Sequence, residues 1–341
     1  MRELMNCLYV QTQGTVLHLD HDAVLARCDQ QPLRRVPLRR LEGITAIGRV
    51  SLTPSLIHRC GHDGITVTWL TERGRHAGTL RGRTNGNVLL RLAQFRSYED
   101  PGHRLDLART LVAGKLVNSA RFARHAARLV PSPADAIGLR AIAANLDTTR
   151  PTLMEAMSLD EVRGIEGAAA KLHFSAVRLA LHHDLGFEVR SRRPPLSPFN
   201  ALISFVYTLA RARIEHSCES AGLDPQVGFL HSVRPGRPAL ALDLLEEHRP
   251  GLDQLCTTLV NRRQLGRLDF LTEQGGAVLL TDDGRRKVLT AWAQHLEHVV
   301  RHQVLREQLP YGLTFSVQAT LMARHLRGDL PFYLPFITSP D

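Results

Sequence analysis

The stretch LDLARTLVAGKLVNSARFARHAARL, residues 105–129, decides the class of fold. Apolar residues and alanines recur in it with a helical period, arginines fall between them, and Pro131 follows shortly after. Such a pattern is typical of a long amphipathic helix that ends before a proline. The chain from about residue 86 onward is therefore expected to be α-helical.

Two capping motifs predict helices further along the chain. Ser158 and Glu161 have the spacing of a capping box, which begins a helix. Ser197 is a suitable N-cap and Pro198 follows at the first helical position, so a second helix is predicted there, ending near Gly222.

The last third of the chain continues this pattern. A helix is predicted to begin at about Leu240 and to end at Pro250, because a proline disrupts a helix interior. Two glycines in the middle of residues 270–280 predict a small hairpin between helices.

The first 85 residues differ from the rest. Short runs of strand-forming residues are separated there by turn signals, at residues 7–10, 15–19, 23–26 and 65–70. The expected fold class is therefore α+β, with a small N-terminal antiparallel β domain at 1–85 followed by a larger all-α C-terminal catalytic domain at 86–341.

The composition is strongly basic. The chain has 341 residues, with 43 Lys+Arg against 33 Asp+Glu, a net charge of +10 and a pI near 10.0. Only three of the basic residues are lysines, so 40 are arginines. Arginine matches phosphate geometry well, which favours a phosphate-rich partner. An ordinary basic surface is the alternative that composition leaves open.

Other classes of protein are disfavoured. No stretch has the roughly 18 consecutive apolar residues of a membrane span, and the N-terminus lacks the apolar core of a signal peptide, so we expect a cytoplasmic protein. The five cysteines are scattered and odd in number, which argues against a disulfide framework or a structural zinc site. The cluster His58, Cys60, His62 and Asp63 has zinc-like ligand types but no second ligand pair nearby.

Three places carry acidic or imidazole groups in directed positions. Glu166 lies in a helix just before small residues, and His231 ends an apolar run that enters a Gly/Pro loop. Asp243 shares one helical face with Glu246 and Glu247, and like charges there repel unless a cation lies between them. A surface glutamate and an ordinary hydrogen-bonded histidine remain the alternatives for the first two.

One imidazole with two or three carboxylates forms a hard, mixed donor set. It suits Mg²⁺ or Mn²⁺, and it offers no thiolate that would favour Zn²⁺. Next to a basic surface, such a site would act on a phosphodiester, with arginines offsetting charge in the transition state. Spacing alone leaves open that these acids are unconnected.

Four ordered blocks of sequence carry a resemblance to a known family. They are GIEGAAAK at 164–171, RPPLSPFNALISF at 193–205, GLDP leading to GFLH at 222–231, and LDLLEEHRP at 242–250. Their order and spacing resemble the CRISPR-associated integrase/endonuclease Cas-one (Cas1) family, most nearly its type I-C branch. Three positions differ from the residues usual in that family, none of them a proposed ligand: Ser197, Val233 and His248.

The resemblance implies a fold and a site. Family members have an N-terminal β domain and a larger α-helical domain that holds the metal. By this resemblance Glu166, His231 and Glu246 would be the metal ligands and catalytic residues, Asp243 a nearby catalytic acid, and Mg²⁺ or Mn²⁺ the cofactor.

The resemblance also implies a reaction and partners. Members act with the small Cas-two (Cas2) protein and insert foreign DNA as new spacers into a CRISPR array, by attack of a 3′-hydroxyl on a repeat phosphodiester. Double-stranded protospacer and repeat DNA would be the substrates. The resemblance further implies a homodimer formed through the β domain, and a heterohexamer of two such dimers with Cas2.

Basic residues near the proposed ligands are candidates for DNA contact, and a solvated face is the alternative for each: Arg163, Lys171, Arg192, Arg193, Arg234, Arg237 and Arg249. Two other functions remain open. One is a metal-dependent nuclease that acts on branched DNA in repair, which a Cas2 partner or a CRISPR array would distinguish. The other is a non-catalytic DNA-binding scaffold, which would be insensitive to chelation.

Overall fold

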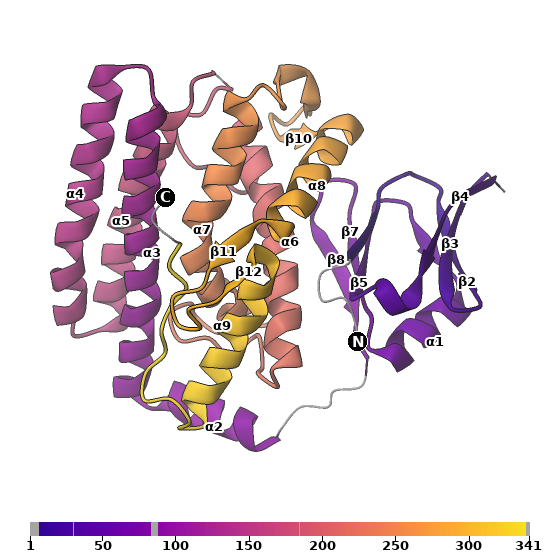
Figure 1. The fold of residues 1–341 in the computed structure, drawn as a ribbon, viewed down its shortest axis with the longest axis horizontal. Helices are drawn as coiled ribbons and strands as arrows, with labels where there is room; N and C mark the ends of the chain where they lie inside the picture. Colours follow the sequence, from indigo (N-terminus) through magenta and orange to yellow (C-terminus); the bar gives the residue numbers. More distant parts are fainter. Residues whose placement is uncertain (1–6, 30, 83–87, 184, 339–341) are drawn as a thin grey trace. The chain divides into compact units, whose positions relative to one another are not determined.

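The computed structural model describes residues 7–29, 31–82, 88–183 and 185–338 (Figure 1). The chain divides into two compact units, residues 1–85 and 86–341. Strands dominate the first unit and helices the second, which confirms the predicted α+β fold class. The assignment of dimerisation to the first unit and catalysis to the second stays a prediction.

Two four-stranded sheets form the first unit. One has the order β1 (Cys7–Val10), β5 (Gly43–Ile47), β7 (Thr66–Leu70), β8 (His76–Leu80), and the other β4 (Gln31–Pro37), β3 (Ala23–Cys28), β2 (Val16–Asp20), β6 (Ser51–Leu52). β5 pairs in parallel with β1 and β7, and β2 with β6. The sheets are thus mixed, where an antiparallel domain was predicted. Parallel partners are joined by long crossovers, so strand patterns along the sequence do not reveal them.

A helix, α1 (Pro54–Asp63), lies in the crossover between β6 and β7. Its Leu56 and Cys60 are fully buried in one core with Ile44 of one sheet and Leu17 of the other. Burial raises the pKa of the Cys60 thiol to about 11. The segment with zinc-like ligand types therefore contributes an uncharged thiol to a hydrophobic core.

Eight helices and four short strands make up the described part of the second unit. They are α2 (Val88–Glu99), α3 (Pro101–Leu129), α4 (Pro133–Glu155), α5 (Leu159–Ala180), α6 (Pro198–Ser220), α7 (Ala239–Asn261), β9 (Phe270–Thr272), β10 (Val278–Leu280), α8 (Asp282–Glu297), β11 (Val299–Arg301), β12 (Gln308–Pro310) and α9 (Tyr311–Leu326). β9 and β10 form the predicted hairpin. None of the helices in the described ranges is long and apolar enough to cross a membrane.

Side-chain caps fix where the predicted helices begin. The Ser158 hydroxyl accepts from Glu161 N at 3.2 Å and begins α5, and the Ser197 hydroxyl accepts from Asn200 N at 3.3 Å and begins α6. Asp100 caps α3, which begins at Pro101 and so before the periodic stretch that predicted it. The predicted end at Leu129 is confirmed.

One predicted helix end is wrong. α7 continues through Pro250 to Asn261. A proline costs one backbone hydrogen bond, but the following turns bury Leu252, Cys256 and Leu259, and this packing sustains the helix. The consequence is a long buried helix whose N-terminal half carries Asp243, Glu246 and Glu247.

α3 is the central helix of this unit and packs against α4, α5 and α7 (Figure 1). The C-terminal segment ties α3 to α7, because Asn118 Nδ2 donates to Phe336 O at 2.9 Å while Glu247 accepts from Phe336 N. Tyr333 also donates its hydroxyl to Glu247. These bonds hold α3 and α7 at a fixed separation, and the candidate site lies between them.

Candidate metal and DNA site

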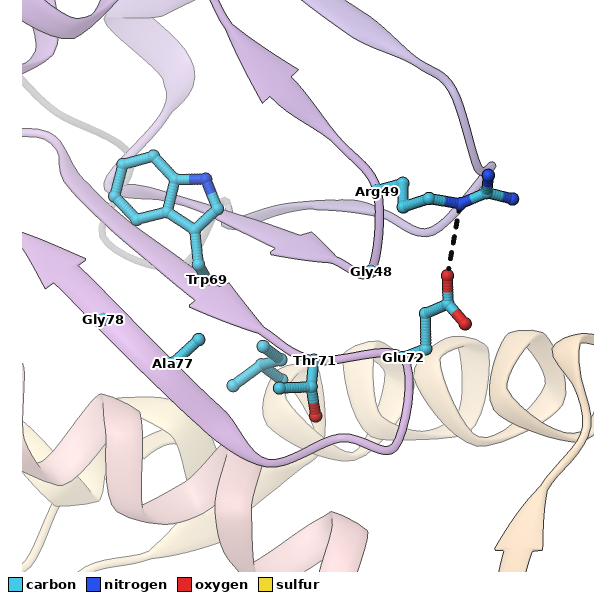
Figure 2. Close-up of a pocket in the computed structure, with 8 residues that line it drawn as sticks. Gly48, Arg49, Trp69, Thr71, Glu72, Ala77 and Gly78 are labelled. Carbon is cyan, nitrogen blue, oxygen red and sulfur yellow. Dashed lines mark ion pairs between the residues drawn. The ribbon is translucent and has the colours of Figure 1, made fainter.

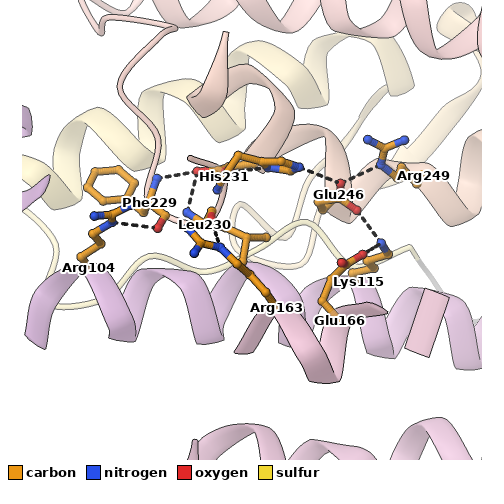
Figure 3. A network of polar contacts seen from close by, with 10 residues as sticks. Arg104, Lys115, Arg163, Glu166, Phe229, Leu230, His231, Glu246 and Arg249 are labelled. Carbon is orange, nitrogen blue, oxygen red and sulfur yellow. Dashed lines mark hydrogen bonds and ion pairs between the residues drawn. The ribbon is translucent and has the colours of Figure 1, made fainter. Parts of the chain in front are cut away.

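Carboxylates from two helices meet at one lysine (Figure 3). Lys115 of α3 donates to Glu246 Oε2 of α7 at 2.6 Å, and it also contacts Glu166 Oε1 of α5. The side chains of Lys115 and Glu246 are 7% and 4% exposed, whereas Glu166 is 26% exposed. The structure thus brings together two predicted ligands that lie far apart in the sequence.

His231 completes this group from the loop between α6 and α7. Its Nε2 lies 3.8 Å from Glu246 Oε1, and Figure 3 shows the ring directed at that glutamate. Its Nδ1 lies 2.7 Å from Asp243 Oδ1. When the Nδ1–H group donates a hydrogen bond to the Asp243 carboxylate, Nε2 keeps a lone pair directed toward Glu246. This tautomer is the one that a metal ligand needs.

Asp243 organises the loop as well as the imidazole. It is fully buried and accepts backbone N–H groups from Phe229 at 2.5 Å, Leu230 at 3.0 Å and His231 at 2.9 Å. These contacts all point to the loop rather than to the other carboxylates. This placement favours an orienting role for Asp243.

Glycine is required where this loop passes α7. A Cβ on Gly228 would lie 2.5 Å from Ala239 C, 2.6 Å from Asp243 Oδ2 and 2.7 Å from Leu240 N. We expect Gly228→Ala to lower the free energy of unfolding by about 1–3 kcal/mol, because backbone atoms cannot move aside cheaply. Denaturant unfolding checks this against Gly61→Ala, a position in α1 with open space around it. Equal stability of the two variants would contradict the account.

Buried cations set the charge of Glu246. Arg249 Nε lies 2.8 Å from Glu246 Oε1, and its guanidinium lies 4.5 Å from the ring centroid of Tyr207. Burial acts to raise the pKa of Glu246, but Arg249, Lys115 and His231 outweigh it and hold that pKa well below its usual range. Glu246 is therefore ionised at neutral pH.

Glu246 and Glu166 keep Lys115 in its charged form. Burial acts to lower its pKa, but the attraction of Glu246 and then Glu166 reverses this and raises it. The site therefore contains a buried ammonium between two carboxylates.

Four of the predicted DNA-contact residues form a basic cluster, which consists of Arg163, Arg193, Arg234 and Arg237. Burial lowers the pKa of Arg237, and repulsion from the three other arginines lowers it further. Arg163 Nε also donates to Leu230 O at 3.0 Å, beside His231. The basic cluster thus lies next to the loop that holds the imidazole.

The other three candidates differ from one another. Lys171 and Arg192 are exposed. Arg249 forms an ion pair with Glu246 and lies over the Tyr207 ring, and its side chain is only 13% exposed. These contacts favour a role for Arg249 in positioning Glu246 rather than in binding DNA.

The donor set fits a hard divalent cation, although its present arrangement holds an ammonium. Among residues 7–29, 31–82, 88–183 and 185–338, no three His, Cys, Asp or Glu side chains are arranged to hold a metal ion as they stand. Lys115 instead stands between Glu166 and Glu246. Two carboxylates that already enclose one positive charge, with an imidazole lone pair beside them, match the ligands of Mg²⁺ or Mn²⁺.

Sequence reasoning missed two cations of this site. From the sequence, Lys115 had no assigned role, and Arg249 was predicted only as a DNA contact. A lysine on the apolar side of a helix, next to Leu111, Val112 and Leu116, is a signal that could have identified it as a buried partner of acids.

A separate hollow lies in the first unit and is lined by Gly48, Trp69, Ala77 and neighbouring residues (Figure 2). Arg49 and Glu72 at its rim form an ion pair with 3.3 Å between Nε and Oε1. Trp69 contributes apolar surface. The hollow lacks the combination of acids and imidazole found beside Lys115, so we assign it no chemistry.

The chain is similar in sequence to proteins of a known family. The family model described as CRISPR associated protein Cas1 matches residues 8–294. A CRISPR-associated endonuclease Cas1 of Rhodospirillum rubrum is 42% identical over 98% of this chain and 99% of its own length. A CRISPR-associated endonuclease Cas1 of Chlorobaculum tepidum is 41% identical over 99% of both.

Solved structures share the fold. A Cas1 protein from Thermotoga maritima has a TM-score of 0.82 at 23% identity, covering 98% of this chain and 100% of its own. A casposase bound to an integration product has a TM-score of 0.84 at 21% identity, covering 97% and 93%. A Cas6-RT-Cas1–Cas2 complex has a TM-score of 0.82 at 20% identity over 97% of this chain and 36% of that one.

Proposed function

The chain belongs to the Cas1 family, and from that premise we propose that it is a divalent-metal-dependent DNA endonuclease and integrase of CRISPR adaptation. It would insert new spacers into a CRISPR array by attack of a protospacer 3′-hydroxyl on a repeat phosphodiester. The observation that carries the proposal is the meeting of Glu166 and Glu246 at one buried cation, with His231 Nε2 3.8 Å from Glu246 Oε1.

Glu166, His231 and Glu246 would hold the ion. Mg²⁺ or Mn²⁺ bound there would polarise the phosphoryl oxygen and lower the barrier to attack. In the reaction the 3′-oxygen forms a bond to phosphorus, the repeat's own 3′-oxygen departs with the bonding electron pair, and the proton of the attacking hydroxyl is released. Cleavage is the same displacement with water as the nucleophile.

Neighbouring residues would prepare the ligands. Asp243 keeps the His231 lone pair on Nε2, and Arg249 fixes one oxygen of Glu246. The basic cluster would hold the DNA backbone beside the ligands and offset charge as it develops on the phosphoryl oxygens. Together, these residues would form a site suited to phosphoryl transfer.

Partners are part of the proposal. The Cas1 relative from Rhodospirillum rubrum is named an endonuclease, and structural neighbours include a casposase with its integration product and a complex that contains Cas2. We infer double-stranded protospacer and repeat DNA as substrates, a homodimer formed through the first unit, and a heterohexamer with Cas2. The type I-C branch and a cytoplasmic location stay predictions.

An integration assay tests the proposal as a whole. Protospacer duplex and a plasmid carrying a CRISPR repeat are incubated with the protein and Cas2, with EDTA and then with Mg²⁺ or Mn²⁺ restored. We expect integration that EDTA abolishes and either ion restores. Cleavage of branched DNA without integration would favour the repair nuclease, and DNA binding without any metal-dependent chemistry would favour the scaffold.

A charge variant tests the DNA surface. Replacing Arg234 and Arg237 with glutamine is expected to reduce DNA affinity and to make the slope of log affinity against log salt shallower by about two, because each lost phosphate contact removes about one. Fluorescence anisotropy between roughly 50 and 200 mM salt measures this. The matched control replaces Arg140 and Arg150, which are exposed on α4. Equal slopes in the two double variants would contradict the DNA-facing role.

A further inference from the structure

Lys115 differs from the other lysines of the chain. The sequence has only three; Lys171 is exposed, and Lys287 is half-exposed and pairs with one carboxylate, that of Asp269, at 2.7 Å. Lys115 is buried and reaches carboxylates on two other helices. A long flexible side chain thus delivers a single positive charge to the centre of the candidate metal site.

The two carboxylates need a cation there. Ionised carboxylates buried close together repel strongly unless a positive charge lies between them. Glu246 has a second partner in Arg249, but among the described residues Lys115 is the only ion-pair partner of Glu166. Without Lys115, the side chain of Glu166 would face Glu246 with no charge between them.

We propose that Lys115 is the resident counter-ion of the metal site, and that a divalent cation expels its ammonium group on binding. The inference rests on the proposed function, because it takes Glu166 and Glu246 as the ligands. The oxygens that contact Lys115 Nζ are the oxygens that would face the ion. A divalent ion that bridged these two oxygens would take the position that the ammonium now holds between them, so the ammonium would have to leave.

Expulsion is open to a lysine side chain. Its four-carbon stem has several rotatable bonds that can redirect the ammonium, and that ammonium is a compact charge that water or a phosphate oxygen solvates well. Arg249 is less free to move, since its guanidinium lies over the Tyr207 ring and donates to Glu246 Oε1, the oxygen that Lys115 does not contact. The geometry therefore assigns the displaced charge to Lys115, and metal affinity is set by competition with it.

Lysine NMR tests the displacement directly on the intact protein. With [¹³Cε]lysine labelling the chain gives three signals, which Lys171→Arg and Lys287→Arg assign by elimination without altering Lys115. Titration with Mg²⁺ is expected to shift the Lys115 signal in step with metal binding and to leave the Lys287 signal unchanged. An unchanged Lys115 signal at saturating Mg²⁺ would overturn the proposal.

A substitution tests the competition. Lys115→Met removes the charge and keeps a similar length, so its Mn²⁺ affinity, measured by electron paramagnetic resonance of free Mn²⁺, is expected to rise about tenfold. The protein without metal is expected to melt at a lower temperature and to gain more from Mn²⁺ than the wild type. Lys287→Met is the matched control. Equal or weaker Mn²⁺ binding in Lys115→Met would contradict the proposal, because loss of a merely structural lysine would not tighten metal binding.

Mn²⁺ binding by Glu166→Gln separates the ligand assignment from the counter-ion role of Lys115. If the wild type binds Mn²⁺ and Glu166→Gln does not, the metal site stands, and the Lys115 results alone decide the counter-ion. If Glu166→Gln binds Mn²⁺ as well as the wild type, the ligand assignment in the proposed function is wrong, and the counter-ion proposal falls with it.

Discussion

Glu246→Gln is expected to lower divalent-dependent DNA cleavage and strand transfer by at least about 10³-fold. The Glu246 carboxylate is 4% exposed, and it contacts Lys115 and Arg249 while facing His231 Nε2. The neutral glutamine amide has a similar shape, but it carries no charge to offset Lys115 and Arg249. It is also a weak ligand for a divalent metal ion. Single-turnover rates on a repeat-containing duplex with Mn²⁺ measure the loss, and Glu297→Gln, an exposed position of α8, is the control.

Stability separates Glu246 from Glu166. Breaking a buried ion pair on one side costs about 3–5 kcal/mol, so Glu246→Gln is expected to lower the free energy of unfolding by an amount in that range. Glu166→Gln is expected to lose the same activity with a smaller loss of stability, because Glu166 is 26% exposed and, in the described part of the chain, forms an ion pair with Lys115 only. Normal rates in Glu166→Gln would show that the two carboxylates do not share one metal, and undiminished stability of Glu246→Gln would show that its ion pairs are weak.

Local signals predicted much of the second unit. Ser158 and Ser197 cap helices where the sequence places them, because an N-cap depends on residues within one turn. The helix end predicted at Pro250 was wrong, because whether a helix continues past a proline depends on the packing of its next turns. Local sequence patterns also could not predict the parallel strand pairs of the first unit, because pairs such as β1 and β5 join distant segments.

The candidate site shows the same limit more sharply. Resemblance supplied Glu166 and Glu246 by motif, and the structure brings both to one point. Lys115 lies 51 residues from one and 131 from the other, so no spacing rule connects it to either. Its role emerges only from the packing of α3 against α5 and α7, which places a buried ammonium where two carboxylates converge.

Asp243→Asn is expected to lower the activity by about 10²-fold while Glu166 and Glu246 stay intact. Asp243 Oδ1 accepts from the ring Nδ1 and the backbone N of His231, and Oδ2 accepts from Phe229 N and Leu230 N. An asparagine has one acceptor oxygen, so its amide NH₂ must face donors on one of the two sides. If it faces His231, the ring is driven to the tautomer with its proton on Nε2, and the lone pair directed at the metal is lost.

The readout that isolates this effect is Mn²⁺ affinity measured beside activity. Both are expected to fall together in Asp243→Asn, since the imidazole no longer offers Nε2 as a ligand. Asp283→Asn, whose side chain is 74% exposed on α8, should change neither. Wild-type Mn²⁺ affinity and rate in a folded Asp243→Asn protein would mean that His231 is oriented by something other than this carboxylate. Reduced activity with unchanged Mn²⁺ affinity would move the role of Asp243 from the imidazole to the loop that carries it.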